Sequence, residues 1–392
     1  MVELLSPAGD LEKLKIAYLY GADACYIGGK NFSLRANASN FSNDEIKEAC
    51  RVAHSLNKRL YVTINIVFHD DDVEGLFEYL CFLEDCGVDA VIVSDPLVID
   101  MIQENNINLE IHFSTQGSTT NKESVKYLMS KGVSRIVLAR EVSAYDIRNI
   151  IEETGASIEV FLHGAMCTCY SGRCVLSNYF TGRDSNRGGC AQVCRFVFDL
   201  DKKRDIQYSI ATKDLNLGKE IPKLIEMGVS SLKIEGRMRS IYYIATVISC
   251  YRNLIDAYYN NSFTPTLVKK MMTILDRVAN RESSNQYFKG NVNSDDQYYI
   301  GREEVSNKDF LGIVISYDED NKMIVLEQRN YFKIGDKVNI FTPSLKEYNF
   351  VIDKIYDEEG NLLECARHPK QIVKIPYSEK IEVSSMMRVN FL

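Results

Sequence analysis

Short β-branched apolar runs alternate with amphipathic helical patterns from the first residue to about residue 260, and this alternation constrains the fold most strongly. Chains that alternate strands and helices form a mostly parallel sheet with right-handed crossovers. Eight runs have the length and composition of strands: residues 2–5, 24–27, 60–65, 90–93, 109–113, 135–138, 157–162 and 231–234. We therefore predict an α/β domain over residues 1–262 with a (β/α)8 TIM-barrel-like fold. The alternative is an open, doubly wound sheet.

One interval interrupts this regular spacing. The seventh and eighth expected strands begin near residues 157 and 231, much farther apart than the others, and residues 163–216 hold five of the eleven cysteines. An insertion after a barrel strand lies at the C-terminal face of the barrel, where such proteins place their chemistry. We therefore expect the functional site in this Cys-rich insertion.

The hydrophobic period changes in the last part of the chain. Residues 263–304 combine a helical pattern with a polar, Asn- and Ser-rich passage, which we interpret as a helical linker. From residue 305 to residue 392, short runs of alternating apolar and polar residues are separated by Gly, Asn and Asp. This pattern predicts a small antiparallel β-barrel domain.

Composition excludes several classes of protein. Hydrophobic residues make up 45% and charged residues 26% of the chain, as in ordinary globular proteins. No apolar run is long enough to span a membrane, and the N-terminus lacks the features of a signal peptide. We therefore expect a cytoplasmic protein with no membrane attachment. In that reducing compartment, a cysteine cluster indicates metal binding or catalysis rather than disulfides.

Four cysteines, Cys167, Cys174, Cys190 and Cys194, follow a C-x6-C-x15-C-x3-C spacing, with Cys169 as a fifth thiol. Four thiolates suit either zinc or an iron–sulfur cluster. The spacing is typical of neither zinc ribbons nor ferredoxins, so both metals remain open on this basis. Packing of the thiols as small hydrophobic groups is a third alternative, which the surrounding Gly, Arg, Ser and Asn residues disfavour.

The segment from residue 159 to residue 177 resembles the signature of the collagenase-like peptidase family U-32, E-x-F-x2-G-[SA]-aliphatic-C-x4-G-x-C-x-aliphatic-S. The matching positions are Glu159, Phe161, Gly164, Ala165, Met166, Cys167, Gly172, Cys174, Leu176 and Ser177. Within the family, HGAMC and GRCVLSNYFTGRDSNRGGCAQVCR are most similar to the branch that hydroxylates the wobble uridine of tRNA. The resemblance implies a tRNA substrate, prephenate as cosubstrate, and a 4Fe–4S cluster on Cys167, Cys174, Cys190 and Cys194. It also implies a heteromer with a paralogue as one form of assembly, and sister branches act on ribosomal RNA or quinone precursors.

The family name implies proteolysis, but the sequence lacks the HExxH and GxSxG protease motifs. A Ser–His pair of Ser114 with His112, or a Cys–His pair of Cys167 with His163, would be the alternative route to a peptidase. A cysteine bound to a cluster is unavailable as a nucleophile, which disfavours the second pair. The candidate catalytic residues, all from family-like stretches at expected strand ends, are His112, Gln116, Arg140, His163, Glu235 and Arg237.

Basic and aromatic residues are interleaved in the Cys-rich insertion. We expect its arginines to bind RNA phosphates: Arg173, Arg183, Arg187 and Arg195. The aromatic residues among them could stack on unpaired bases: Tyr179, Phe180, Phe196 and Phe198. The alternative is a solvated loop with its aromatic residues in the core. Because the net charge is −8, an RNA-binding protein of this composition must gather positive charge on one face.

A small anionic cosubstrate requires cations at the barrel mouth. Candidates follow the second, sixth and eighth expected strands: Arg35, Arg140, Arg237 and Arg239. A guanidinium group binds a carboxylate with two parallel hydrogen bonds, which suits a dicarboxylate such as prephenate. The alternative is that each arginine pairs with a nearby acid, for example Arg140 with Glu141.

Overall fold

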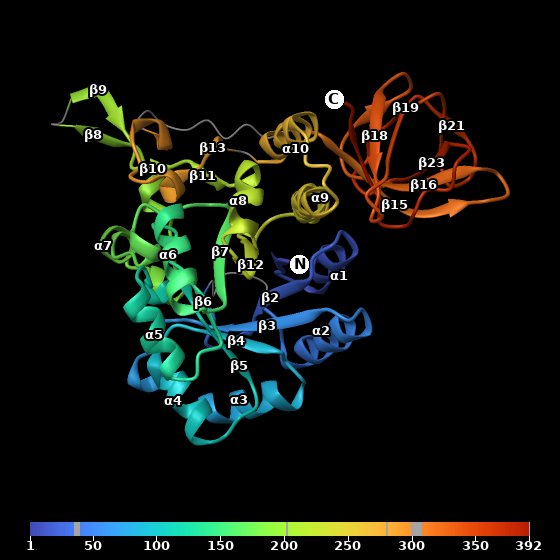
Figure 1. Cartoon of the computed structure of the whole chain (residues 1–392). Coiled ribbons are helices and arrows are strands. Elements are labelled where there is room, and N and C mark those ends of the chain that lie inside the picture. The colour runs from blue at the N-terminus through green and yellow to red at the C-terminus, as the bar shows by residue number, and fades with distance from the viewer. Residues whose placement is uncertain (35–39, 201–202, 280, 299–307, 392) are drawn as a thin grey trace.

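The computed structural model describes residues 1–34, 40–200, 203–279, 281–298 and 308–391, and in them eight parallel strands close into a barrel (Figure 1). The strands are β1 (Glu3–Pro7), β2 (Ala24–Gly28), β3 (Arg59–Ile64), β4 (Ala90–Val93), β5 (Glu110–Phe113), β6 (Arg135–Val137), β7 (Ile158–Gly164) and β12 (Ser231–Ile234). β12 pairs with β1 on one side and with β7 on the other, which closes the sheet. The predicted TIM-like barrel is therefore confirmed, and the open sheet is excluded.

Helices connect and cover the strands, in the order α1 (Leu11–Leu19), α2 (Asn43–Ser55), α3 (Leu76–Asp85), α4 (Pro96–Glu104), α5 (Lys122–Ser130), α6 (Ala144–Thr154), α8 (Ile221–Glu226) and α9 (Ile241–Tyr259). Capping residues mark the N-termini of most of these helices. For example, Ser42 and Glu45 form a capping box at the start of α2, and the buried face of that helix carries Ile46, Ala49 and Ala53. No helix in the described part of the chain combines the length and apolar character needed to cross a bilayer.

The Cys-rich segment leaves and re-enters the barrel at the C-terminal end of β7. It contains α7 (Leu176–Thr181), the hairpin of β8 (Phe198–Leu200) and β9 (Lys203–Tyr208), β10 (Ala211–Thr212), β11 (Asp214–Asn216) and the short turns η3 (Tyr170–Gly172), η4 (Ser185–Arg187) and η5 (Val193–Arg195). β11 runs antiparallel to β7, with Leu215 opposite Gly164. The end of the segment is thus built into the edge of the barrel.

The region expected to be a linker contains α10 (Pro265–Val278), β13 (Ser283–Ser284) and β14 (Gln297–Tyr298). The boundary expected near residue 305 lies outside the described residues. Beyond it, an antiparallel sheet has the strand order β19-β18-β24-β15-β16-β23-β20-β21 and curls into a half-barrel. Its strands are β15 (Phe310–Asp318), β16 (Met323–Gln328), β18 (Lys337–Phe341), β19 (Glu347–Val351), β20 (Ile355–Tyr356), β21 (Leu362–Leu363), β23 (Ile372–Pro376) and β24 (Met386–Val389), with β17 (Phe332–Lys333) and β22 (Cys365–Ala366) pairing separately.

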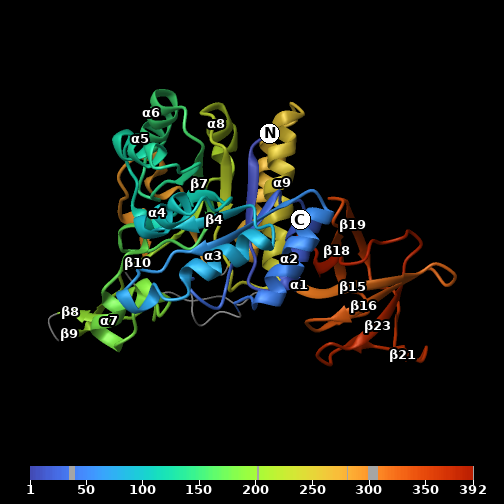
Figure 2. The same cartoon turned by 90° about the horizontal axis from the view of Figure 1, so that it is seen from below.

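This C-terminal sheet packs on α1, α9 and α10. Tyr20, the residue that caps the C-terminus of α1, donates a hydrogen bond to the carbonyl oxygen of Ser384 at 2.9 Å. The ring of Tyr242 in α9 stacks on Phe310 with centroids 4.7 Å apart. Arg277 of α10 makes two hydrogen bonds with a carboxylate of the sheet domain, that of Asp309. Figures 1 and 2 show that the sheet and the β8–β9 hairpin lie on opposite sides of the barrel.

Candidate active site at the C-terminal end of the barrel

Polar contacts hold the Cys-rich segment over the loops that follow β3, β5 and β6. Arg187 makes a bidentate ion pair with Asp72 in η1 (Asp70–Asp72), the turn after β3. Arg173 Nε donates to the carbonyl oxygen of Gln116 at 2.6 Å, in η2 (Thr115–Gly117) after β5. The amide of Ser171 donates to Glu141 Oε1 at 2.7 Å, after β6. Because segments that follow parallel strands lie at their C-terminal ends, the cysteines are positioned at the barrel mouth.

These contacts show what two of the predicted RNA-binding arginines do in the folded chain. The Arg187 guanidinium lowers the pKa of Asp72 to about 2 by donating hydrogen bonds to its carboxylate. Arg187 therefore tethers the segment to the barrel, and Arg173 contributes to the same attachment through Gln116. Arg183 and Arg195 instead line an open pocket on the surface of the segment.

The five thiols of the segment lie close enough to perturb one another. Burial and a hydrogen bond to Cys174 raise the pKa of Cys169 to about 12. Burial would also raise the pKa of Cys174, but the thiol of Cys169 and the amides of Leu176 and Ser177 donate to its sulfur and lower the pKa overall. Such N–H donors stabilise a thiolate, which is the form that binds metals.

The remaining thiols belong to the same group. Burial raises the pKa values of Cys167 and Cys194, and each of these thiols raises the pKa of a neighbour in the group. Cys190 is exposed and contributes to the raised pKa of Cys194. The turn before Cys190 requires glycine, since Gly188 has a φ of +92° and a Cβ on Gly189 would lie 2.7 Å from a carbonyl oxygen.

The chemistry of this donor set fits a thiolate-bound metal centre. Five cysteines lie within residues 167–194, and the amides of Leu176 and Ser177 donate to the sulfur of Cys174. Within the described residues, no group of three or more Cys, His, Asp or Glu side chains is arranged around a common point for a metal ion. Binding a cluster would therefore require the thiols to turn toward one centre.

His163 is the penultimate residue of β7 and packs against α9. Its ring contacts the rings of Tyr243 and Tyr251, and its Nδ1 lies 2.9 Å from Tyr251 Oη. Because Tyr251 donates its proton to Asn216 Oδ1 at 3.0 Å, His163 Nδ1 must be the donor in this contact. Burial lowers the pKa of His163 to about 4, so the ring is neutral. No hydrogen bond joins His163 to Cys167 in the described chain, so the geometry does not provide the Cys–His pair of a peptidase.

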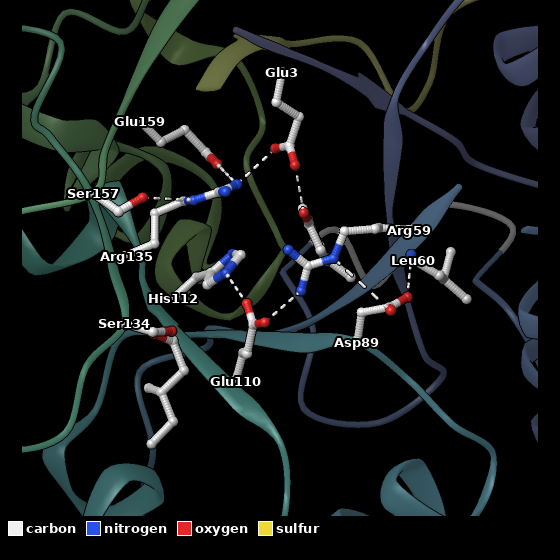
Figure 3. A network of polar contacts seen from close by, with 12 residues as sticks. Glu3, Arg59, Leu60, Asp89, Glu110, His112, Ser134, Arg135, Ser157 and Glu159 are labelled. Atoms are coloured by element: carbon white, nitrogen blue, oxygen red, sulfur yellow. Dashed lines mark hydrogen bonds and ion pairs between the residues drawn. The ribbon is translucent and has the colours of Figure 1, made fainter. Parts of the chain in front are cut away.

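His112 lies inside the barrel in a polar network near the N-terminal ends of the strands (Figure 3). Its Nε2 is 3.4 Å from Glu110 Oε2, and its ring contacts Tyr61 edge to face. Arg135 bridges Glu3 at 2.6 Å and Glu159 at 3.6 Å in the same network. In such barrels, the N-terminal end contributes to stability and the C-terminal end to chemistry. The structure thus separates His112 from the cysteines and places Glu159, the first residue of the signature, in this network.

The other predicted catalytic residues do lie at the C-terminal end. Arg140 donates to the carbonyl oxygen of Ala165 at 2.7 Å and covers the ring of Phe161 at 4.0 Å. Arg237 is buried and donates to Ser33 Oγ at 3.1 Å and to the carbonyl oxygen of Leu34.

Glu235, on the same loop as Arg237, accepts a hydrogen bond from Tyr26 Oη at 3.2 Å. Gln116 is held through its carbonyl oxygen, as described above. Arg35, which was expected to contribute to this set, lies outside the described residues.

A group of arginines around the buried Asp214 was not predicted as a whole. Arg281 Nη1 lies 3.1 Å from Asp214 Oδ1, and Arg239 Nη2 lies 3.7 Å from Oδ2. Burial and the nearby charges of Arg281 and Arg239 lower the pKa of Arg195, which places a third guanidinium group close by. Arg195 and Arg239 were each predicted from the sequence as site residues. Arg281 was not, because a residue after α10 carries no sequence signal for the barrel mouth.

Two known protein families match this chain, one over the barrel domain and one over the C-terminal sheet domain. Residues 9–298 match Peptidase family U32, and residues 306–388 match the Peptidase family U32 C-terminal domain. The chain is 47% identical to tRNA hydroxylation protein P1 of Bacillus subtilis, over 98% of this chain and 94% of the relative. It is 41% identical to 23S rRNA 5-hydroxycytidine C2501 synthase of Escherichia coli, over 65% of this chain and 39% of that protein. It is also 30% identical to a collagenase of Porphyromonas gingivalis, over 98% and 97% of the two chains.

Proposed function

Because this chain belongs to peptidase family U32 and its full-length relatives include a tRNA hydroxylation protein, we propose that it is an RNA-modifying enzyme that installs a 5-hydroxyl group on the wobble uridine of tRNA. The identity of 47% over almost the whole of both chains carries this proposal. The second relative, which is named for hydroxycytidine synthesis in ribosomal RNA, supports hydroxylation of a pyrimidine ring as the shared chemistry. Because tRNA acts in the cytoplasm, the proposed substrate supports a cytoplasmic location.

We further propose that Cys167, Cys174, Cys190 and Cys194 hold a 4Fe–4S cluster, with zinc as the alternative. The mutual proximity of the thiols and the amide donors at Cys174 support this ligand set. A redox-active cluster supplies one-electron chemistry, whereas zinc has no redox chemistry. Hydroxylation at a ring carbon requires an oxidative step, which favours iron over zinc.

The residues around the cysteines position the reactants. The ion pair of Arg187 with Asp72 and the hydrogen bond from Arg173 to Gln116 fix the Cys-rich segment against the barrel. The neutral His163, held by Tyr251, fixes the end of β7 where the segment begins. A small anionic cosubstrate, which we propose to be prephenate, would bind at the excess positive charge near Asp214.

A peptidase is the competing function because one full-length relative is named a collagenase. The described geometry gives it little support. In the described part of the chain, no hydrogen bond joins His163 to Cys167 or His112 to Ser114, and His112 Nε2 instead lies 3.4 Å from Glu110 Oε2. A nucleophile and its base must lie within hydrogen-bonding distance of each other.

Mass spectrometry of tRNA nucleosides from a strain that lacks the gene tests the proposal. We expect 5-hydroxyuridine derivatives to disappear, to return with the wild-type chain, and to stay absent with Cys174→Ser. Cys365→Ser, which changes a half-buried thiol of the C-terminal domain, is the matched control and should restore the modification. Unchanged nucleosides in the deletion strain, in the absence of a second pathway, would contradict the proposal. Cleavage of gelatin by the purified chain, lost in Cys174→Ser, would favour the peptidase.

A further inference from the structure

An open pocket lies on the Cys-rich segment, between α7 and the β8–β9 hairpin. It has a volume of about 540 Å³ and is lined by Arg183, Cys190, Gln192, Arg195, Phe196 and Val197. Pockets of this size accept one small molecule or one nucleotide, and are far too small for an RNA duplex. We propose that this pocket binds a single unpaired pyrimidine nucleotide of the RNA substrate, an inference that rests on the proposed function.

Apolar side chains around the pocket are exposed. Phe196 and Val197 in its wall are 43% and 49% exposed, and Tyr179 on the neighbouring α7 is 83% exposed. Phe180, beside Tyr179, is 51% exposed and packs edge to face against it. A group of exposed aromatic residues on one segment indicates a binding surface rather than a core. Unpaired bases stack on such rings in single-stranded RNA recognition.

The lining of the pocket is positively charged. Arg183 and Arg195 are the two cations of the lining, and the described lining contains no acid. The pocket therefore carries local positive charge, although the net charge of the whole chain is −8. The phosphates on either side of a bound base carry the complementary charge. A neutral apolar ligand would not explain these two guanidinium groups, and a protein partner would more often meet a surface of mixed charge.

Gln192 of the lining has an uncommon backbone conformation and an oriented side-chain amide. Its backbone is left-handed, with a φ of +56°, which is uncommon for a residue other than glycine and is often associated with functional sites. Its Oε1 accepts a hydrogen bond from Arg195 Nη1, which fixes the orientation of the amide group. The amide nitrogen can then donate to a carbonyl oxygen on the edge of a uracil or cytosine ring.

The position of Cys190 connects the pocket with the chemistry. This cysteine lines the pocket and is one of the four proposed cluster ligands. A base in the pocket would therefore lie against the wall that contains Cys190, a proposed ligand of the cluster. Phe196 would contribute a stacking surface, Gln192 a hydrogen bond to the base, and Arg183 and Arg195 contacts with the flanking phosphates.

Binding of a fluorescein-labelled oligouridine to the full-length chain, followed by anisotropy, tests this inference without requiring activity. Loss of a stacking aromatic ring is expected to weaken single-strand binding about tenfold in Phe196→Ala. Phe196→Tyr, which keeps a ring, should restore the affinity. Tyr331→Ala removes a 56% exposed aromatic ring from the C-terminal domain and should leave binding unchanged. A self-complementary duplex of the same length should bind more weakly than the single strand.

Photocrosslinking locates the bound base directly. An oligonucleotide with one 5-iodouridine should crosslink within residues 179–197, and the Phe196→Ala variant should lose that crosslink while keeping the wild-type melting temperature. Equal affinities of Phe196→Ala and the wild type, or a crosslink on another part of the chain, would overturn the inference. If the pocket binds the oligonucleotide but the wild-type chain restores no 5-hydroxyuridine in cells, the proposed function is contradicted, whereas the inference about the pocket is supported. If Phe196→Ala restores the modification fully and binds the oligonucleotide with normal affinity, the inference about the pocket is contradicted, whereas the proposed function is supported.

Discussion

Replacing Lys233 by methionine should destabilise the barrel strongly, because it removes a cation from a fully buried carboxylate. Lys233 Nζ lies 2.8 Å from Glu159 Oε1, and both side chains are almost completely buried. The variant leaves Glu159 with Arg135, which is 3.6 Å away and is also paired with Glu3. Removal of one partner from a buried ion pair costs about 3–5 kcal/mol, because the remaining charge stays uncompensated.

Thermal unfolding followed by circular dichroism measures this cost. At about 2–4 °C per kcal/mol, the expected fall in Tm is roughly 6–20 °C at pH 7. The control is Lys126→Met, which removes the exposed ion pair of Lys126 with Glu123, 3.0 Å apart. Exposed pairs contribute about 0.3–0.5 kcal/mol, so that variant should differ from the wild type by about 1 °C.

The pH dependence of the Tm tests whether the uncompensated charge of Glu159 causes the loss of stability. Burial alone would raise the pKa of Glu159, but Lys233 and Arg135 hold it below its usual value. A lowered pKa adds stability above the unfolded pKa, and this stability is lost as the pH falls through the folded pKa. Without Lys233, the pKa of Glu159 rises. The carboxylate of the variant therefore takes up a proton as the pH falls from 8 to 5, which removes the buried charge. The difference in Tm between the wild type and the variant should become smaller over this range. Adding Glu159→Gln to Lys233→Met should recover most of the Tm. A loss no larger than that of the control, or a double variant as unstable as the single one, would refute the reasoning.

Three further predictions concern the site. Anaerobically purified Cys167→Ser should lose iron while Cys169→Ser retains it, and stoichiometric zinc without iron in the wild type would contradict the cluster. Asp72→Asn should free the Cys-rich segment by weakening its contact with Arg187, at a cost of about 1–2 kcal/mol, which limited proteolysis would detect as faster cleavage within residues 170–200. The lowered pKa of Asp72 keeps this ion pair formed until the pH falls to about 2, so the wild-type cleavage rate should be constant between pH 5 and pH 8. Arg281→Met should weaken prephenate binding about tenfold in calorimetry, since a hydrogen bond to a charged group is lost, and an unchanged Kd would remove Arg281 from the cosubstrate site.

The sequence by itself determined the two architectures, because both depend on local patterns. All eight expected barrel strands are present, and their ends agree with the structure to within one or two residues. The change to a period of two correctly indicated the antiparallel sheet beyond residue 308. A strand or helix is recognised from neighbouring residues, whose spacing decides which face is apolar. The cysteine-bearing segment was also recognised in this way, by its length and its thiols.

Only the tertiary structure decided which polar side chains meet. Glu159 begins the family signature and His112 belongs to a family-like stretch, yet their strands place them in the network at the N-terminal end of the barrel. Arg187 was expected to face RNA, but the fold brings it to Asp72, which lies 115 residues away. Arg281 follows α10 and reaches Asp214, 67 residues earlier in the chain. Such contacts depend on strand register and on the path of the returning chain, which are set by the packing of the whole barrel and leave no trace in local periodicity.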